Sequence, residues 1–74
     1  MKRYKNLSGD SGVVAYEVHP KRIDIRFTNG RTYKYTSRSA GADNIELMKK
    51  LAVAGRGLST FISQVVKDGY EDSW

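Results

Sequence analysis

The most informative stretch of this chain is Ile23-Asp24-Ile25-Arg26-Phe27-Thr28-Asn29-Gly30-Arg31-Thr32-Tyr33-Lys34-Tyr35. Apolar and polar residues alternate on both sides of Asn29-Gly30, and such alternation is typical of strands that bury one face. Asn and Gly both tolerate positive φ, so this pair favours a tight turn between antiparallel strands. The stretch therefore predicts a β-hairpin.

The register of this hairpin determines which face the two tyrosines occupy. A two-residue turn at Asn29-Gly30 places Tyr33 and Tyr35 on the face opposite the isoleucines. A three-residue loop that begins at Thr28 and bulges at its glycine places them on the same face, because a one-residue shift exchanges the faces. We expect the bulged loop, since it gathers the apolar and aromatic residues on one side.

A third strand is expected before the hairpin, at Val13–Val18. This segment is rich in β-branched and aromatic residues, and its stronger apolar face is Val14, Tyr16 and Val18. A turn that contains Pro20 joins it to the hairpin. The three strands together predict an antiparallel meander.

Two amphipathic helices follow a linker of small residues. The first is expected to begin at Asp43, with Glu46 three residues on as in a capping box, or earlier at Gly41, and to end at Gly55. The second is expected to end at Gly69. Its apolar stripe has i, i+3, i+4, i+7, i+8 spacing and comprises Leu58, Phe61, Ile62, Val65 and Val66. The order predicts an α+β fold: a three-stranded antiparallel meander followed by two α-helices packed on one face, in two layers.

The length of 74 residues leaves room for one domain. We expect this domain at residues 13–70, after a basic, flexible N-terminal arm at residues 1–12 and before a tail at residues 71–74. No apolar run approaches the roughly 20 residues of a membrane span, and no signal-peptide hydrophobic segment follows the basic N-terminus. We therefore expect a cytoplasmic protein with no membrane partner.

Side chains for catalysis or metal binding are scarce. Cysteine is absent and His19 is the single histidine, which excludes a thiolate nucleophile and a cluster of imidazole ligands. His19 precedes Pro20 and is interpreted as a turn residue, while capping explains the pair Asp43 and Glu46. Because no nucleophile, base and orienting group stand out together, we expect no enzyme activity, no metal site and no cofactor.

Positive charge is concentrated in the first half of the chain. Residues 1–38 hold nine Lys or Arg and three acids, a net charge of +6, whereas residues 39–74 carry −1. A basic sheet half favours RNA or another polyanion as the partner, bound by phosphate contacts that weaken with salt. The expected contact residues are Arg26, Arg31, Lys34 and Arg38.

Three further residues have two interpretations each. Tyr33 and Tyr35 either stack unpaired bases on an exposed sheet face or pack into the core against the helices, as the bulged register favours. Arg56, between Gly55 and Gly57, either contacts a phosphate at the start of the second helix or belongs to an ordinary interhelix turn. These three residues join the four basic ones as the candidate nucleic-acid site.

A function of a different class is also open, namely a protein-interaction or homodimerisation module with no nucleic-acid role. Its features are an edge strand at Val13–Val18 that can pair with another chain, and an apolar patch extended by Tyr70 and Trp74. The net charge would then serve solubility.

The centre of the chain has the motif Phe27-x-Asn29-Gly30-x-x-Tyr33-x-Tyr35, with the glycine-rich break Gly55-Arg56-Gly57-Leu58 before the last helix and Tyr70 near the end. With these features the chain resembles the KTSC domain family, which is named for a domain at the C-terminus of some lysyl-tRNA synthetases and also occurs as a stand-alone bacterial protein. The resemblance extends from about Val13 to Tyr70. It implies a small domain whose suggested partner is RNA, by association with the synthetase. Many members have Val-Pro where this chain has Ser37-Arg38.

Overall fold

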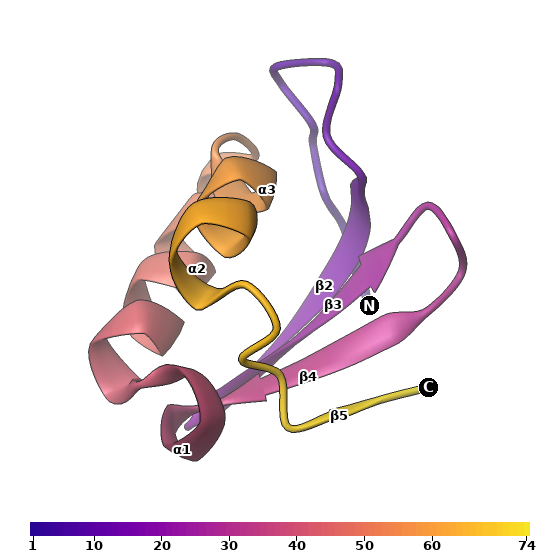
Figure 1. Cartoon of the computed structure of the whole chain (residues 1–74). Helices are drawn as coiled ribbons and strands as arrows, with labels where there is room; N and C mark the ends of the chain where they lie inside the picture. Colours follow the sequence, from indigo (N-terminus) through magenta and orange to yellow (C-terminus); the bar gives the residue numbers. More distant parts are fainter.

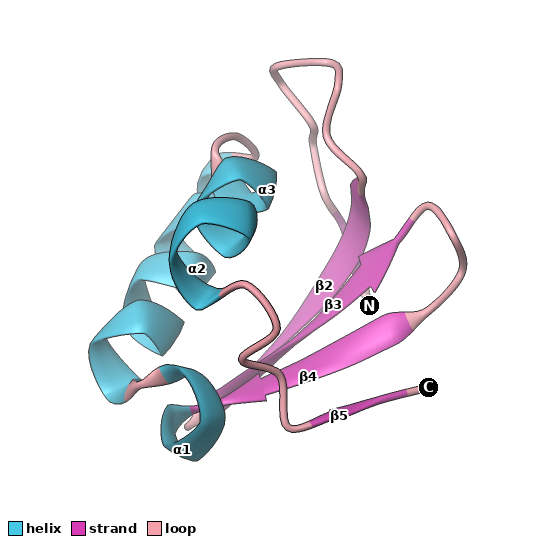
Figure 2. Cartoon of the chain, in the orientation of Figure 1, coloured by secondary structure: helices cyan, strands magenta, loops and turns pink.

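The structure is a computed structural model that describes all residues from Met1 to Trp74. Five strands form one antiparallel sheet and are ordered in space as they are along the chain (Figures 1 and 2). They are β1 (Lys2–Arg3), β2 (Val13–His19), β3 (Arg22–Phe27), β4 (Thr32–Thr36) and β5 (Asp72–Ser73). The helical segments cover one face of this sheet: α1 (Ser37–Ala40), α2 (Ala42–Ala54), α3 (Leu58–Phe61) and its π-helical continuation η1 (Ile62–Val66). The predicted α+β class is confirmed, but the expected linker before the two helices contains the additional short helix α1.

The β3–β4 hairpin has the bulged loop that its sequence predicts. Ile25 lies opposite Tyr33, and Gly30, at φ 85°, donates its N–H to the Phe27 carbonyl at 2.9 Å. The apolar and aromatic residues of both strands therefore share the face that the helices cover. Tyr35 is buried on this face, 2% exposed, so the core interpretation is confirmed for this residue.

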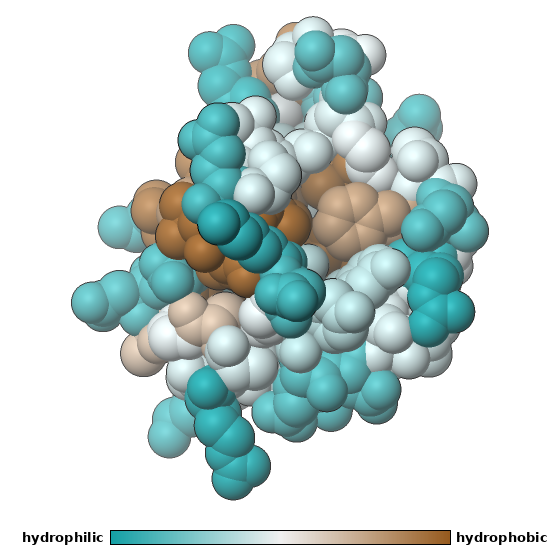
Figure 3. Space-filling view, viewed as in Figure 1, coloured by the Kyte–Doolittle hydropathy of each residue, from teal (hydrophilic) through white to brown (hydrophobic).

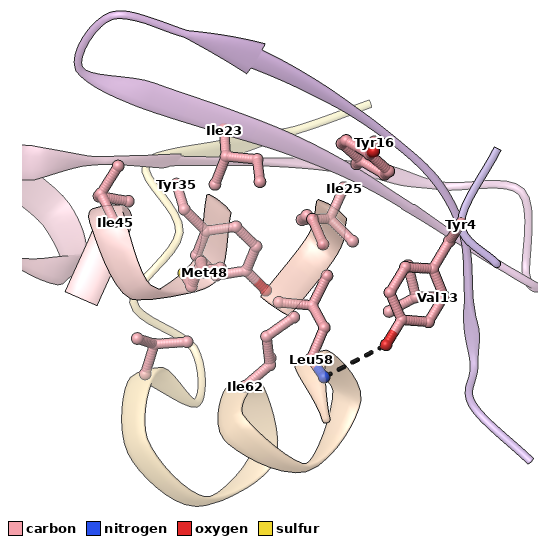
Figure 4. Packing of buried hydrophobic residues seen from close by; sticks show 12 residues of the cluster. Tyr4, Val13, Tyr16, Ile23, Ile25, Tyr35, Ile45, Met48, Leu58 and Ile62 are labelled. Atoms are coloured by element: carbon pink, nitrogen blue, oxygen red, sulfur yellow. Dashed lines mark hydrogen bonds between the residues drawn. The ribbon is translucent and has the colours of Figure 1, made fainter. Parts of the chain in front are cut away.

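Both ends of the chain belong to the sheet, which corrects the expected arm at residues 1–12 and tail at residues 71–74. β1 pairs with β2, and the buried Tyr4 follows it. The Tyr4 hydroxyl accepts a hydrogen bond of 3.3 Å from the N–H of Leu58, at the start of α3 (Figure 4). At the opposite edge, β5 pairs with β4. The expected three-stranded meander is thus the centre of a five-stranded sheet.

A bulge in β2 changes the face that its valines occupy. The pairing with β3 shifts between Val13 and Ala15, so Val13 lies in the core and Val14 is exposed. Tyr16 is buried as expected. Val18 lies opposite the buried Ile23 but is exposed near the end of the strand. The prediction that Val14 shares the apolar face of Tyr16 is wrong, whereas Val18 lies on that face as predicted but stays exposed.

The first long helix begins differently from its sequence prediction. Gly41 is the N-cap of α2 without a side-chain cap, so Asp43 lies inside the first turn. Glu46 forms an ion pair with a lysine of the next turn. A capping box is found one element earlier, where Thr36 and Ser39 bond reciprocally at the start of α1. The expected Asp43 cap is therefore wrong, and the alternative start at Gly41 is confirmed.

The glycines at the helix ends have different roles. Gly55 ends α2 in the left-handed conformation, as predicted. The second helix ends at Val66, before the expected Gly69, and the next residue, Lys67, has φ 50°. A Cβ at Gly69 would lie 2.8 Å from the Val66 carbonyl oxygen. Gly69 is thus required for the close return of the chain after η1.

The core lies between the sheet and the helices. Figure 4 shows Ile23, Ile25 and Tyr35 pointing from the sheet toward Met48 and Ile62. The two helix stripes contribute six buried residues, whereas Val65 of the predicted second stripe is exposed. None of the helices has the length and apolar character that crossing a bilayer requires. The twelve core residues are Tyr4, Val13, Tyr16, Ile23, Ile25, Tyr35, Ile45, Met48, Ala52, Leu58, Ile62 and Val66.

Candidate functional site

The face of the sheet that the helices leave uncovered is its open face. Since the isoleucines of β3 point into the core, the alternate residues Arg22, Asp24 and Arg26 project from the open face. Residues directly opposite each other on paired strands project from the same face. The strand register therefore assigns the remaining side chains of the open face to rows that cross the sheet.

One row crosses strands β1 to β4, ends at the residue that follows β5, and combines arginine with tryptophan. Arg3 lies opposite Ala15, Ala15 opposite Arg26, and Arg26 opposite Thr32. Thr32 and Trp74 exchange two backbone hydrogen bonds of 2.7 and 2.9 Å, which places Trp74 next in line. These five residues form the arginine–tryptophan row.

The side chains of this row are available to a ligand. Neither Arg3 nor Arg26 forms an ion pair. Arg26 donates from Nε to the Thr32 hydroxyl at 3.3 Å, and this threonine is fully buried beneath its neighbours. Trp74 is 54% exposed. The row thus presents two unpaired guanidinium groups and an open indole ring.

The neighbouring row of the open face is acidic. Glu17 lies opposite Asp24, Asp24 opposite Lys34, and Lys34 opposite Asp72. Lys34 is held by Glu71, with 3.6 Å between Nζ and Oε2. This acidic row therefore contains three carboxylates and a single ammonium group that is already paired.

A hydrogen-bonded network anchors the acidic row. Arg22 donates from two nitrogens to the two carboxylate oxygens of Asp24, each at 3.1 Å. The hydrogen bond to Asp24 raises the pKa of Arg22. His19 Nε2 lies 3.2 Å from Glu17 Oε2 and 3.4 Å from Asp24 Oδ2. The buried Asp24 carboxylate is thus satisfied, and the network holds β2 and β3 together.

The five basic residues predicted to contact a polyanion do not form one surface. Arg26 belongs to the arginine–tryptophan row, whereas Lys34 belongs to the acidic row and is ion-paired. Arg31 lies at the hairpin tip and donates to a serine hydroxyl of β5 at 2.9 Å. Arg38 lies in α1, and Arg56 in the turn between α2 and α3. Alternation along the strands and the helical connection separate residues that are close in sequence.

Tyr33 and Tyr35 lie on the helix-covered face and belong to a cluster of four aromatic rings. The ring centroids of Phe27 and Tyr33 are 5.3 Å apart, and those of Tyr33 and Tyr70 are 4.7 Å apart. Tyr35 and Tyr70 are separated by 6.2 Å, and all three pairs are edge-to-face. The interpretation that both tyrosines stack bases on the open face is therefore wrong.

The aromatic cluster lines a cleft of about 430 Å³. The face seen in Figure 3 is hollowed between the helical layer and the sheet, and hydrophobic side chains are visible there. Burial, reinforced by Tyr33 and Tyr70, raises the pKa of Tyr35 to about 12, so its hydroxyl is neutral at ordinary pH. The aromatic cleft is lined by Phe27, Tyr33, Tyr35 and Tyr70 together with Gly12, Thr28, Asn29, Lys67 and Asp68.

Arg3, Trp74 and Lys67 were not among the sequence-based candidate site residues. Arg3 and Trp74 lie in or beside two-residue strands, which are too short to show alternation. Lys67 follows a helix whose expected end was Gly69. One sequence signal was available, because a lone Trp in a charged tail is an unusual exposed aromatic residue.

No family model, curated protein or solved structure matches this chain. The resemblance to the KTSC domain family accordingly stays a prediction, based on the hairpin motif, the glycine-rich break at Gly55-Arg56-Gly57 and Tyr70.

Proposed function

We propose that this protein binds single-stranded nucleic acid, RNA in particular, through the arginine–tryptophan row. In this row Arg3 and Arg26 contact phosphates, and Trp74 stacks on an unpaired base. Because neighbouring strands lie about 4.8 Å apart, the row is roughly 19 Å long, with about 10 Å between successive members of this trio. The observation that carries the proposal is the presence of two unpaired guanidinium groups and one exposed indole in a single line.

A pocket beside Arg3 supports an anionic ligand. It has a volume of about 300 Å³, and its lining includes Arg3, Lys5, Asn6, Ser11 and Thr28 but no carboxylate. Neither of the two cations forms an ion pair. Cationic groups together with amide and hydroxyl donors match the chemistry of phosphate oxygens.

The acidic row favours one path for the bound strand. Its exposed carboxylates, Glu17 and Asp72, lie next to the arginine–tryptophan row on the same face, whereas Asp24 is buried and paired with Arg22. Phosphates are repelled there, which leaves the row nearer the hairpin tip as the favourable route. The resemblance to the KTSC family implies the same class of partner.

The test uses Trp74, the single tryptophan of the chain, as a fluorescent reporter of RNA binding. Titration with a short unstructured RNA should change the Trp74 emission, and the affinity should fall as salt rises. Substitution Arg26→Ala should weaken binding to all sequences and lower the slope of log affinity against log salt by about 0.7.

The matched control is Arg56→Ala, which removes the same charge from an exposed position in the helical layer. It should leave the affinity nearly unchanged. Equal losses of RNA affinity for Arg26→Ala and Arg56→Ala would mean that binding depends only on net charge. That result would reject the arginine–tryptophan row as the binding site. Absence of binding at low salt would reject the function altogether.

The alternative, a protein-interaction or homodimerisation module, is favoured by the free edge of β2 beyond its pairing with β1. The apolar patch expected to join Tyr70 with Trp74 is not supported, because Tyr70 packs on Tyr33 whereas Trp74 is aligned with the open-face residue Thr32. Light scattering at several protein concentrations tests this alternative. A strictly monomeric protein would exclude the homodimerisation hypothesis.

A further inference from the structure

The walls of the aromatic cleft are flat and differ in exposure. Tyr35 is fully buried and Phe27 and Tyr33 are half-buried, whereas Tyr70 is 38% exposed. The edge-to-face contacts of Tyr33 with Phe27 and Tyr70 hold the rings in fixed positions. A cleft with such walls is suited to a flat, weakly polar group that enters from solvent.

The rim of the cleft is polar and is not engaged elsewhere. The side chains of Thr28, Lys67 and Asp68 line the cleft and form no hydrogen bond or ion pair within the chain. Asn29 uses its amide oxygen to accept from the N–H of Arg31, which leaves its amide nitrogen free. The rim therefore offers donors from three side chains and a carboxylate acceptor, and nucleobases carry both kinds of group on their edges.

The segment that brings Lys67 and Tyr70 to the cleft is held in an unusual conformation. Lys67 has φ 50° and ψ −118°, a combination that residues with a Cβ rarely adopt. Gly69 passes so close to the Val66 carbonyl that no side chain fits. Strained backbone of this kind concentrates at ligand sites, where the surrounding structure maintains it.

The aromatic cleft and the arginine–tryptophan row meet at the tip of the β3–β4 hairpin. Arg26 of the row precedes Phe27 of the cleft, and Thr32 of the row precedes Tyr33 of the cleft. Consecutive strand residues point to opposite faces, so the two sites lie back to back at the same end of the sheet. Arg31, exposed at the tip, lies between them. A nucleic-acid strand that leaves the row around this tip passes a third arginine before it reaches the cleft.

We propose that the aromatic cleft holds one unpaired nucleobase of the strand whose backbone follows the arginine–tryptophan row. This inference rests on the proposed function and adds base recognition to it. The base lies against Tyr70 and Tyr33, while Asn29 and Lys67 hydrogen-bond its edge. The row then contributes affinity that is independent of sequence, and the cleft contributes preference among bases.

The first test compares an RNA of about eight nucleotides with a strand of equal length that lacks all bases. Substitution Tyr70→Ala should weaken binding of the base-containing strand about tenfold and leave the abasic strand unaffected, whereas Tyr70→Phe should retain wild-type affinity. An effect of Tyr70→Ala on the base-containing strand alone would show that Tyr70 contacts a base. Retained affinity in Tyr70→Phe would show that the aromatic ring, and not the hydroxyl, makes this contact.

The second test uses Lys67→Gly, which removes the rim ammonium while glycine tolerates the local positive φ. This variant should fold at least as stably as wild type and should bind the base-containing strand several-fold more weakly. In wild type, nucleoside 5′-monophosphates should shift the NMR amide signals of Asn29, Tyr33 and Lys67.

The outcomes separate this inference from the proposed function. If Arg26→Ala weakens RNA binding but Tyr70→Ala and Lys67→Gly do not, the cleft is not a base site and the row alone binds nucleic acid. If the monophosphates leave the cleft signals unshifted while a peptide rich in phenylalanine shifts them, the cleft binds an aromatic side chain and the inference is overturned. Loss of all RNA binding at low salt in wild type would reject both proposals.

Discussion

The two faces of the β3–β4 hairpin carry opposite chemistries at the same end of the molecule. Arg26 and Thr32 project from the open face, where the guanidinium and indole groups of the row meet solvent. Phe27 and Tyr33, one residue further along each strand, project toward the helices and line the aromatic cleft. Because side chains alternate along a pleated strand, neighbouring residues of β3 and β4 contribute to opposite surfaces without competition for space. The comparison also predicts that the helix-side face carries the stability of the domain, whereas the open face contributes mainly to binding.

The largest expected effect is on the helix-side face. Substitution Tyr35→Ala removes a fully buried ring from the core and should lower the free energy of unfolding by about 3–5 kcal/mol. A domain of 74 residues has little stability to spare, so much of this variant should be unfolded at room temperature. Urea denaturation followed by circular dichroism measures the change. A loss below 1 kcal/mol would contradict the assignment of Tyr35 to the core.

Measuring the free energy of unfolding at alkaline pH tests the burial of Tyr35 without creating a cavity in the core. Burial raises the pKa of Tyr35 to about 12, whereas an unfolded chain ionises tyrosine near pH 10. Above pH 10 the unfolded state releases a proton that the folded state retains, so the stability present below pH 10 declines by on the order of 2 kcal/mol toward pH 12. The variant Tyr35→Phe lacks this group and should decline less over the same range. Parallel curves for the two proteins would show that the Tyr35 hydroxyl does not couple to folding.

The smallest expected effect on stability is on the open face. Substitution Trp74→Ala removes an exposed side chain and should change the free energy of unfolding by no more than about 0.5 kcal/mol. The same variant should bind single-stranded RNA several-fold more weakly, because a stacking surface is lost. Anisotropy of a labelled RNA replaces tryptophan fluorescence as the measurement. A large loss of stability would mean that the indole covers Thr32 and belongs to the fold, which would remove the distinction between the faces.

Much of the architecture was predictable from local pattern. The Asn29-Gly30 pair and the alternation on either side of it predict the hairpin and its bulged register, because only this register gathers the apolar residues on one face. The helical stripes and the Gly55 stop were predictable for the same reason, since each spans several turns or requires one particular backbone conformation. The expected Asp43 cap was predicted from only two residues, Asp43 and Glu46. The start of the helix depended on neighbouring contacts instead, and this prediction failed.

The binding surfaces depended on pairings between residues far apart in the chain. The charge of residues 1–38 indicated a basic sheet half, but the register decides that Lys34 meets Glu71 whereas Arg26 meets no carboxylate. Trp74 enters the arginine–tryptophan row through two hydrogen bonds to Thr32. Composition and periodicity report local preference, which suffices for strands, helices and their buried sides. Contacts between distant segments decide which charges are neutralised and which rings stay exposed. The short terminal strands make such contacts, but they are too short to show a periodicity from which they could be predicted.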